Sequence, residues 1–151
     1  MGLSAGQFNR FTFFKLPAAW WTGVRVRSIS EQICTVTVKY GWRNQNPFNS
    51  MFWAVQGMAA ELSTGALVIN RIRDNGKRIS MLVQNNNANF SKKARGKITF
   101  TCNDGDLIQA ALNKTVATGE GQTFWMRSTG VDEEGTVVST FNFEWTVRIR
   151  K

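Results

Sequence analysis

Apolar and polar residues alternate along several segments of this chain, which is the pattern of half-buried β-strands. In the clearest segment, residues 34–42, cysteine, valine, tyrosine and tryptophan alternate with threonine, lysine and glycine. A period of two with β-branched and aromatic residues predicts a strand. The same reasoning predicts five further strands, at residues 24–29, 78–85, 96–102, 123–131 and 136–150.

From Ser50 onward the apolar period changes to that of a helix. One predicted face is apolar and consists of Met51, Val55, Met58, Leu62, Ala66 and Ile69. This stripe predicts a helix of some five turns with its apolar side toward the core, and Asn49 or Ser50 is a plausible N-cap. The adjoining face holds small residues and one carboxylate, namely Ser50, Ala54, Gly57, Glu61, Thr64 and Gly65. Such a face would allow another backbone or a ligand to approach closely.

Two shorter helices complete the predicted order of elements. Residues 4–22 form an amphipathic segment broken at Pro17, and residues 104–116 form a second short helix. The chain lacks the strict strand–helix–strand alternation of a doubly wound fold. We therefore expect an α+β fold in which an antiparallel sheet packs against one dominant helix. Residues 1–22 would be an N-terminal helical extension packed on a domain formed by residues 23–151.

The absence of histidine from all 151 residues excludes several kinds of chemistry. A Ser-His-Asp or Cys-His nucleophile, the common zinc sites and every histidine general base are ruled out. Acid–base chemistry near neutral pH must then come from a carboxylate, lysine, tyrosine or cysteine whose pKa is shifted.

The two cysteines, Cys34 and Cys102, are too few for a disulfide framework or a cysteine-only zinc site. Both fall within strand patterns, so we expect two small buried residues in a reducing compartment. We expect neither a metal nor another cofactor. No apolar run approaches the length of a membrane span and no secretory signal is present, which favours a cytoplasmic protein.

Nineteen basic residues against ten acidic ones give a formal net charge of +9. Most of the excess falls between Arg71 and Lys97, where Asp74 is the one acidic residue. The basic residues of that stretch are Arg71, Arg73, Lys77, Arg78, Lys92, Lys93, Arg95 and Lys97. Such a patch suits nucleic acid, an anionic membrane surface or the phosphates of a nucleotide-tailed ligand. A solvated face that keeps the protein soluble would show the same composition.

Residues 46–61 read NPFNSMFWAVQGMAAE, and this stretch resembles a signature of the hot-dog acyl-CoA thioesterases. In that family Gln or Asn, Pro and Phe lead into His-Gly-Gly, and a catalytic Glu or Asp follows nine residues after the His. Here Phe52, Trp53 and Ala54 stand at the His-Gly-Gly positions, so that motif is absent, and Glu61 stands at the carboxylate. Residues 89–99 are similar to the family's strand–turn–strand segment.

The resemblance covers the chain from about Gly23 to the C-terminus. It implies the hot-dog fold, in which an antiparallel sheet of about six strands wraps around one long central helix. It also implies a homodimer or a dimer of dimers with sites built across the subunit contact.

The resemblance further implies roles for particular residues. Glu61 would be the general base or nucleophile, and the backbone N–H of Ala54 or Trp53, assisted by the Asn46 amide, would stabilise the oxyanion. Residues expected to bind the substrate, the basic ones through its phosphates, are Lys92, Lys93, Arg95, Lys97, Phe52 and Phe90. Simpler interpretations remain open, namely an ion-paired Glu61, a turn-forming Asn46 and a solvated basic loop.

Three functions from different classes fit the sequence. The leading hypothesis is hydrolysis of an acyl-CoA or a related thioester. The second is a catalytically silent hot-dog protein that binds acyl-CoA or a lipid-like ligand, which the loss of His-Gly-Gly supports. The third is a nucleic-acid binder, which ranks last because the chain lacks an RNP-like aromatic pattern and a basic helix. Hot-dog dehydratases are excluded because they depend on a histidine.

Overall fold

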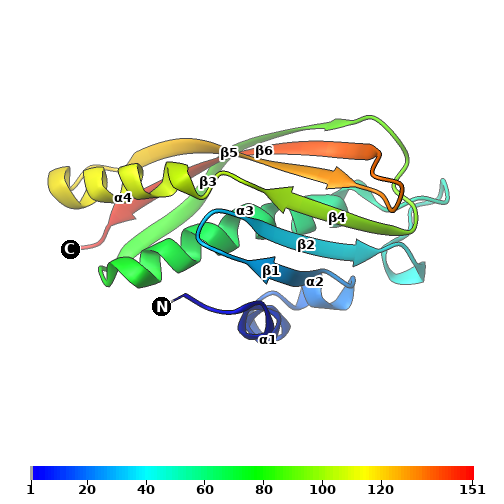
Figure 1. The fold of residues 1–151 in the computed structure, drawn as a ribbon, viewed down its shortest axis with the longest axis horizontal. Coiled ribbons are helices and arrows are strands. Elements are labelled where there is room, and N and C mark those ends of the chain that lie inside the picture. The colour runs from blue at the N-terminus through cyan, green and yellow to red at the C-terminus, as the bar shows by residue number, and fades with distance from the viewer. Residues whose placement is uncertain (1) are drawn as a thin grey trace.

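The computed structural model describes residues 2–151, in which six strands form one antiparallel sheet (Figure 1). In spatial order the strands are β1 (Arg25–Ile29), β2 (Cys34–Lys39), β4 (Lys97–Cys102), β5 (Gln122–Val131), β6 (Val137–Ile149) and β3 (Ile79–Phe90). Every neighbouring pair is antiparallel. The strands β1 and β3 are therefore the two edges of the sheet.

The long helix α3 (Trp53–Asn75) runs along one face of this sheet (Figure 1). It packs against every strand of the sheet except the edge strand β3. Its buried side holds the predicted apolar residues Val55, Leu62 and Ala66, which are at most 7% exposed. The predicted α+β hot-dog architecture, with a sheet curved around one central helix, is confirmed.

The small residues of α3 allow the helix to lie close to β6. A Cβ added at Gly57 would lie 3.5 Å from the Phe141 ring, and one added at Gly65 would lie 3.2 Å from the Trp145 ring. Beside Gly65, the Thr64 hydroxyl accepts a 2.9 Å hydrogen bond from Trp145 Nε1. The close approach that the sequence indicated is therefore made, in this chain, by aromatic residues of the sheet.

Shorter helices flank the sheet and its ends. They are α1 (Ala5–Lys15), α2 (Pro17–Trp21), the 3₁₀ turn η1 (Trp42–Asn44) and α4 (Asp106–Thr118). Ser4 caps α1 in a reciprocal pair with Gln7. The Asn9 side chain accepts from Val26 N–H and donates to the Val26 carbonyl, which fixes α1 on β1. None of the helices in residues 2–151 has the length and hydropathy that a transmembrane span needs.

Three element boundaries differ clearly from the sequence predictions. The strand predicted at residues 34–42 ends at Lys39, and Trp42 begins η1 and is 80% exposed. The N-cap of α3 is Phe52 rather than Asn49 or Ser50. Ser50 is bonded to Asn46 in the preceding loop, and Asn49 adopts a φ of 59°, so neither can cap the helix. The strand predicted at residues 78–85 extends to Phe90. The asparagine-rich residues 85–89 continue it, because they pair with β6 after a bulge at residues 83–85.

Candidate functional site

A cavity of about 500 Å³ opens beside the amino end of α3. Its wall consists of the loop before the helix, the first turn of the helix, and the end of β3 with the residues that follow. Of the predicted site residues, it brings together Asn46, Phe52, Trp53, Phe90, Lys92 and Lys93. The side chains of Phe52, Trp53 and Phe90 are 45%, 59% and 47% exposed, so aromatic rings stand at the mouth.

The first turn of α3 has unused backbone donors on Trp53, which lines this cavity, and on Ala54, which does not line it. The Phe52 N–H donates to the Asn44 carbonyl at 2.8 Å, and the Val55 N–H donates back to Phe52 at 3.0 Å. The Trp53 and Ala54 N–H groups have no acceptor within residues 2–151. Unsatisfied N–H groups at the start of a 23-residue helix favour negative charge, because the helix dipole has its positive end there.

The loop that leads into α3 is held by the Asn46 side chain. Its Oδ1 accepts from the Phe48 N–H at 2.9 Å and the Ser50 N–H at 3.2 Å. Its Nδ2 donates to Ser50 Oγ at 2.9 Å and toward the Met51 carbonyl at 3.4 Å. Both amide hydrogens are thus engaged inside the loop, which gives Asn46 a positioning role in this structure.

Gln56, which the sequence analysis did not select, lies at the back of the cavity. The side chain is 4% exposed. Its Oε1 accepts a 2.7 Å hydrogen bond from Ser139 Oγ on β6, while Nε2 makes one long contact, 3.5 Å, to the Met51 carbonyl. One amide hydrogen therefore remains for a ligand. With Ser63 and Thr64, Gln56 is one of several buried polar residues of α3 that bond to strands of the sheet, and the sequence pattern did not distinguish it from them.

Glu61 does not line this cavity. It lies eight residues after Trp53 on α3, which at a rise of about 1.5 Å per residue is about 12 Å further along the helix. Gly57 and Gly65, one turn to either side, cover Phe141 and Trp145 on β6. Glu61 therefore lies between these two close approaches, on the side of α3 toward β6.

The Glu61 carboxylate has no ion-pair or hydrogen-bond partner among residues 2–151. The residue is exposed at the surface of the single chain. Protein atoms nevertheless surround the carboxyl closely enough to withhold water, and this desolvation raises its pKa above the ordinary value. A lone carboxylate with a raised pKa is a stronger proton acceptor than an ordinary one.

The basic turn (Lys92, Lys93, Arg95 and Lys97) makes contacts of its own. Lys92 Nζ lies 2.8 Å from Asp132, and this hydrogen bond raises the Lys92 pKa and lowers the Asp132 pKa. Lys93 Nζ and Arg95 Nε donate to carbonyls of the loop before α3, at 3.3 and 2.8 Å. The Lys97 N–H donates to Glu133. The acidic hairpin at residues 132–134 thus offsets much of the charge expected here.

The long basic stretch predicted between residues 71 and 97 does not form one patch. Arg71 lies at the far end of α3, where its Nη2 is 3.9 Å from Glu31, while the basic turn meets the acidic hairpin. Helix α3 and strand β3 separate these groups along the molecule (Figure 1). The sequence cluster is therefore divided between two places.

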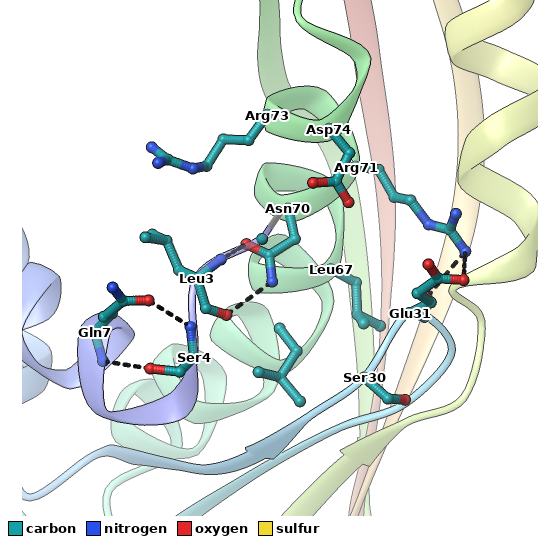
Figure 2. Close-up of a pocket in the computed structure, with 12 residues that line it drawn as sticks. Leu3, Ser4, Gln7, Ser30, Glu31, Leu67, Asn70, Arg71, Arg73 and Asp74 are labelled. Carbon is teal, nitrogen blue, oxygen red and sulfur yellow. Dashed lines mark hydrogen bonds and ion pairs between the residues drawn. The ribbon is translucent and has the colours of Figure 1, made fainter.

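A second cavity, of about 620 Å³, lies between the N-terminal segment and the end of α3 (Figure 2). The Asn70 side chain accepts from the Leu3 N–H at 2.7 Å and donates to the Leu3 carbonyl at 3.0 Å, so it holds this segment. Arginines and carboxylates line the cavity together, among them the Arg71–Glu31 pair. Because charges of both signs line this cavity and Asn70 holds the N-terminal segment there, we interpret it as the contact between that segment and α3.

Thiol and metal chemistry do not fit the described residues. Cys34 and Cys102 are directly opposite each other on β2 and β4 and are fully buried. Burial raises the pKa of each thiol to about 12, so neither forms a thiolate near neutral pH. Residues 2–151 hold no cluster of three or more cysteine and carboxylate side chains that could bind a metal ion.

The sheet and the central helix that packs on it define a protein with the hot-dog fold. The chain belongs to a family described as a domain of unknown function (DUF4442), which matches residues 4–147. No curated protein matches the sequence.

Solved structures of low sequence identity share the fold over nearly the whole chain. PA5026 from Pseudomonas aeruginosa, a protein of unknown function described as a probable thioesterase, has a TM-score of 0.85 and 21% identity over 99% of both chains. Thioesterase HI1161 from Haemophilus influenzae has a TM-score of 0.77 and 14% identity over 99% of this chain and 93% of that one. The E. coli PaaI protein from the phenylacetic acid degradation operon has a TM-score of 0.67 and 14% identity over 97% and 94%.

Proposed function

We propose that this protein hydrolyses an acyl-CoA or a related thioester, with Glu61 as general base or nucleophile. The observation that supports this most directly is the pair of unused N–H groups at the start of α3, on Trp53, which lines the cavity, and on the next residue, Ala54. A thioester carbonyl placed there would be polarised, and the oxyanion of the tetrahedral intermediate would be stabilised. The buried Gln56 amide adds a third donor on the same wall.

In the general-base form, Glu61 takes a proton from water and the resulting hydroxide attacks the thioester carbonyl carbon. The C–S bond breaks and the protonated Glu61 returns the proton to the departing thiolate. The products are a thiol and a carboxylic acid, which then loses its own proton to bulk water. The raised pKa of Glu61 suits both proton transfers. The exposed rings of Phe52 and Phe90 would contact the acyl or pantetheine arm. Lys93, with the other residues of the basic turn, would bind the phosphates.

The distance of about 12 Å between Trp53 and Glu61 along one helix means that a single chain does not bring the two together. We infer that the site is shared between two copies, with the donors from one chain and Glu61 from the other. Strand β3 pairs with β6 on one side and has no partner on the other, and this open edge is where a second copy would extend the sheet. The proposed unit is a homodimer or a dimer of dimers.

The test is a panel of acyl-CoA substrates assayed by thiol release. We expect Glu61→Gln to lower kcat by about 10²–10⁴, the range for loss of a general acid–base group. The matched control is Glu120→Gln, an exposed glutamate in the turn after α4. If Glu61→Gln hydrolyses as fast as the unaltered protein, this mechanism is wrong.

Co-expression of two inactive variants tests the shared site. A dimer of one Glu61→Gln chain and one Gln56→Leu chain has one site with both defects and one intact site. Random pairing therefore restores about one quarter of the unaltered activity, since half of the dimers are mixed and half of their sites are intact. If each chain supplied both residues to its own site, the mixture would stay inactive.

The alternative is a silent protein that binds acyl-CoA or a lipid-like ligand. Trp53 supports it, because an indole stands where the resemblance expects a glycine and narrows the approach to the helix amino end. Calorimetric binding of an acyl-CoA with no thiol release would favour this alternative. Gln56→Leu would then weaken binding, and Glu61→Gln would leave it unchanged.

A further inference from the structure

A continuous group of exposed apolar side chains lies where α1 meets α2. Residues 13–18 are all exposed, and four members of the group, Phe13, Phe14, Leu16 and Trp21, are between 45% and 70% exposed. Isolated exposed apolar residues are normal, but a contiguous group marks an interaction surface. Figure 1 shows α1 and α2 on the outer side of the edge strand β1.

Cations border this apolar group without carboxylate partners. Residues 2–60 contain one acidic residue, Glu31, and it is paired with Arg71 at the other end of β1. The basic residues of the same stretch are Arg10, Lys15, Arg25, Arg27, Lys39 and Arg43. None of them forms an ion pair within the part of the chain that the structure describes.

The aromatic and basic side chains of this surface contact one another in two sets. The Phe13 ring contacts Phe14 at 4.9 Å and Trp20 at 5.3 Å between centroids. The Arg25 guanidinium lies 3.4 Å from the centre of the Trp20 ring, and that of Arg43 lies 5.3 Å from the Trp21 ring. Burial, and after it the like charges of Arg43 and Arg27, lowers the Arg25 pKa.

A cavity of about 520 Å³ opens among these cations. Its charged lining residues are Arg25, Lys39 and Arg43, and none of its lining residues is acidic. The indole of Trp42, 80% exposed, stands at the rim. Three unpaired cations around one hollow have the charge and donors that a phosphate group needs.

We propose that this basic–aromatic surface (Phe13, Phe14, Leu16, Trp21 and Trp42 with Lys15, Arg25, Lys39 and Arg43) docks on the surface of an anionic lipid bilayer. The apolar side chains enter the boundary between headgroups and acyl chains, and the cations bind headgroup phosphates, with one headgroup in the cavity beside Trp42. The proposal is independent of catalysis. It concerns where the protein lies, and it involves neither the unused N–H groups nor Glu61.

A bilayer fits this surface better than a nucleic acid does. Leu16 and Pro17 are exposed between the two helices and offer no ring face on which a base could stack. Phe13 and Phe14 are perpendicular to each other, so they do not form one flat platform. Aromatic and aliphatic side chains bordered by arginine and lysine are typical of a helix at a membrane interface.

The experiment is flotation of the full chain with vesicles of phosphatidylcholine alone or with one quarter phosphatidylglycerol. We expect at least tenfold stronger binding to the anionic vesicles, and loss of that difference in high salt. Lys15→Gln with Arg43→Gln should weaken binding about 25-fold, since each cation near an anionic surface contributes about fivefold. Phe14→Ser with Trp21→Ser should weaken binding at least tenfold. The matched control, Leu107→Ser with Lys114→Gln on the exposed side of α4, should bind as the unaltered protein does.

Four outcomes would overturn the proposal. They are no binding to anionic vesicles, equal binding to both vesicle types, an equal loss in the α4 control, and a smaller oligomer in the Phe14 and Trp21 variant. The last would mean that a second copy covers this surface, and light scattering measures it. A gel shift with a single-stranded RNA, lost in the Lys15 and Arg43 variant while vesicles fail to bind, would assign the surface to nucleic acid. Circular dichroism and thermal melting confirm that each variant is folded.

Discussion

Replacing Gly130 with alanine tests how tightly the sheet is packed behind the central helix. Gly130 on β5 is directly opposite Phe100 on β4, and the Phe100 ring lies over it. A Cβ at this position would be 2.5 Å from Phe100 Cε1 and 2.7 Å from Cζ. The ring has little room to move, because it is fully buried and packs edge-on against Phe141, with 6.1 Å between centroids.

The magnitude follows from this confinement. Adding a methyl group to a well-packed core typically lowers the free energy of unfolding by about 1–3 kcal/mol. Because the Phe100 ring has little room to move, we expect Gly130→Ala to fall in the upper part of this range, about 2–3 kcal/mol. For a chain of this length, about 2–4 °C of Tm is lost per kcal/mol. We therefore expect the Tm to fall by about 4–12 °C.

Urea denaturation followed by tryptophan fluorescence measures the change, and thermal melting checks it. The matched control is Gly121→Ala at the start of β5, where the nearest atoms would be 3.8 Å away. Phe100→Leu in the Gly130→Ala background should recover part of the loss, since leucine leaves space for the methyl group. A change below about 0.5 kcal/mol in Gly130→Ala, within the usual range for surface substitutions, would refute the packing argument.

Two further predictions concern titration. Because the Glu61 pKa is raised in the folded protein, folding favours the protonated carboxyl group. The stability that this protonation contributes is present below the ordinary pKa of 4.5 and is lost as pH rises through the raised pKa. Glu61→Gln should thus be more stable than the unaltered protein at pH 7, and urea midpoints measured from pH 4 to 8 should converge at the acid end. Cys34 and Cys102, with thiol pKa values of about 12, should react with a thiol reagent at pH 8 only after unfolding. Rapid labelling of the folded protein would contradict their burial.

Hydropathy patterns sufficed for the order of elements because each element buries one side. The alternation at residues 34–38 and the stripe through Val55, Leu62 and Ala66 predict a strand and a helix without tertiary information. The patterns failed where contacts between distant segments decide the structure. Asparagines at 85–89 form strand because β6 pairs with them along their length. Ser50 does not cap α3 because Asn46 engages it.

Only the part of the candidate site that comes from one short stretch of the sequence could be predicted. Residues 46–53 share one wall of the cavity because they are neighbours in sequence, and Phe90 joins them through the sheet. The partners of charged side chains were not readable from the sequence. The acidic hairpin at 132–134 meets the basic turn through the pairing of β4, β5 and β6, at a separation of about 40 residues. The role of Gln56 likewise depends on Ser139, 83 residues away.

The loop from Asn44 to Phe52 has a consequence for how a ligand would enter. Its turns are closed by Asn46, and Lys93 and Arg95 bind its carbonyl oxygens from outside. The buried Asn44 amide joins it to the Thr22 and Lys39 carbonyls. A loop held by so many hydrogen bonds has its conformation before a ligand binds. Binding of a ligand should therefore cost little conformational entropy. Its rate should depend on diffusion into the cavity rather than on a slow rearrangement of this loop.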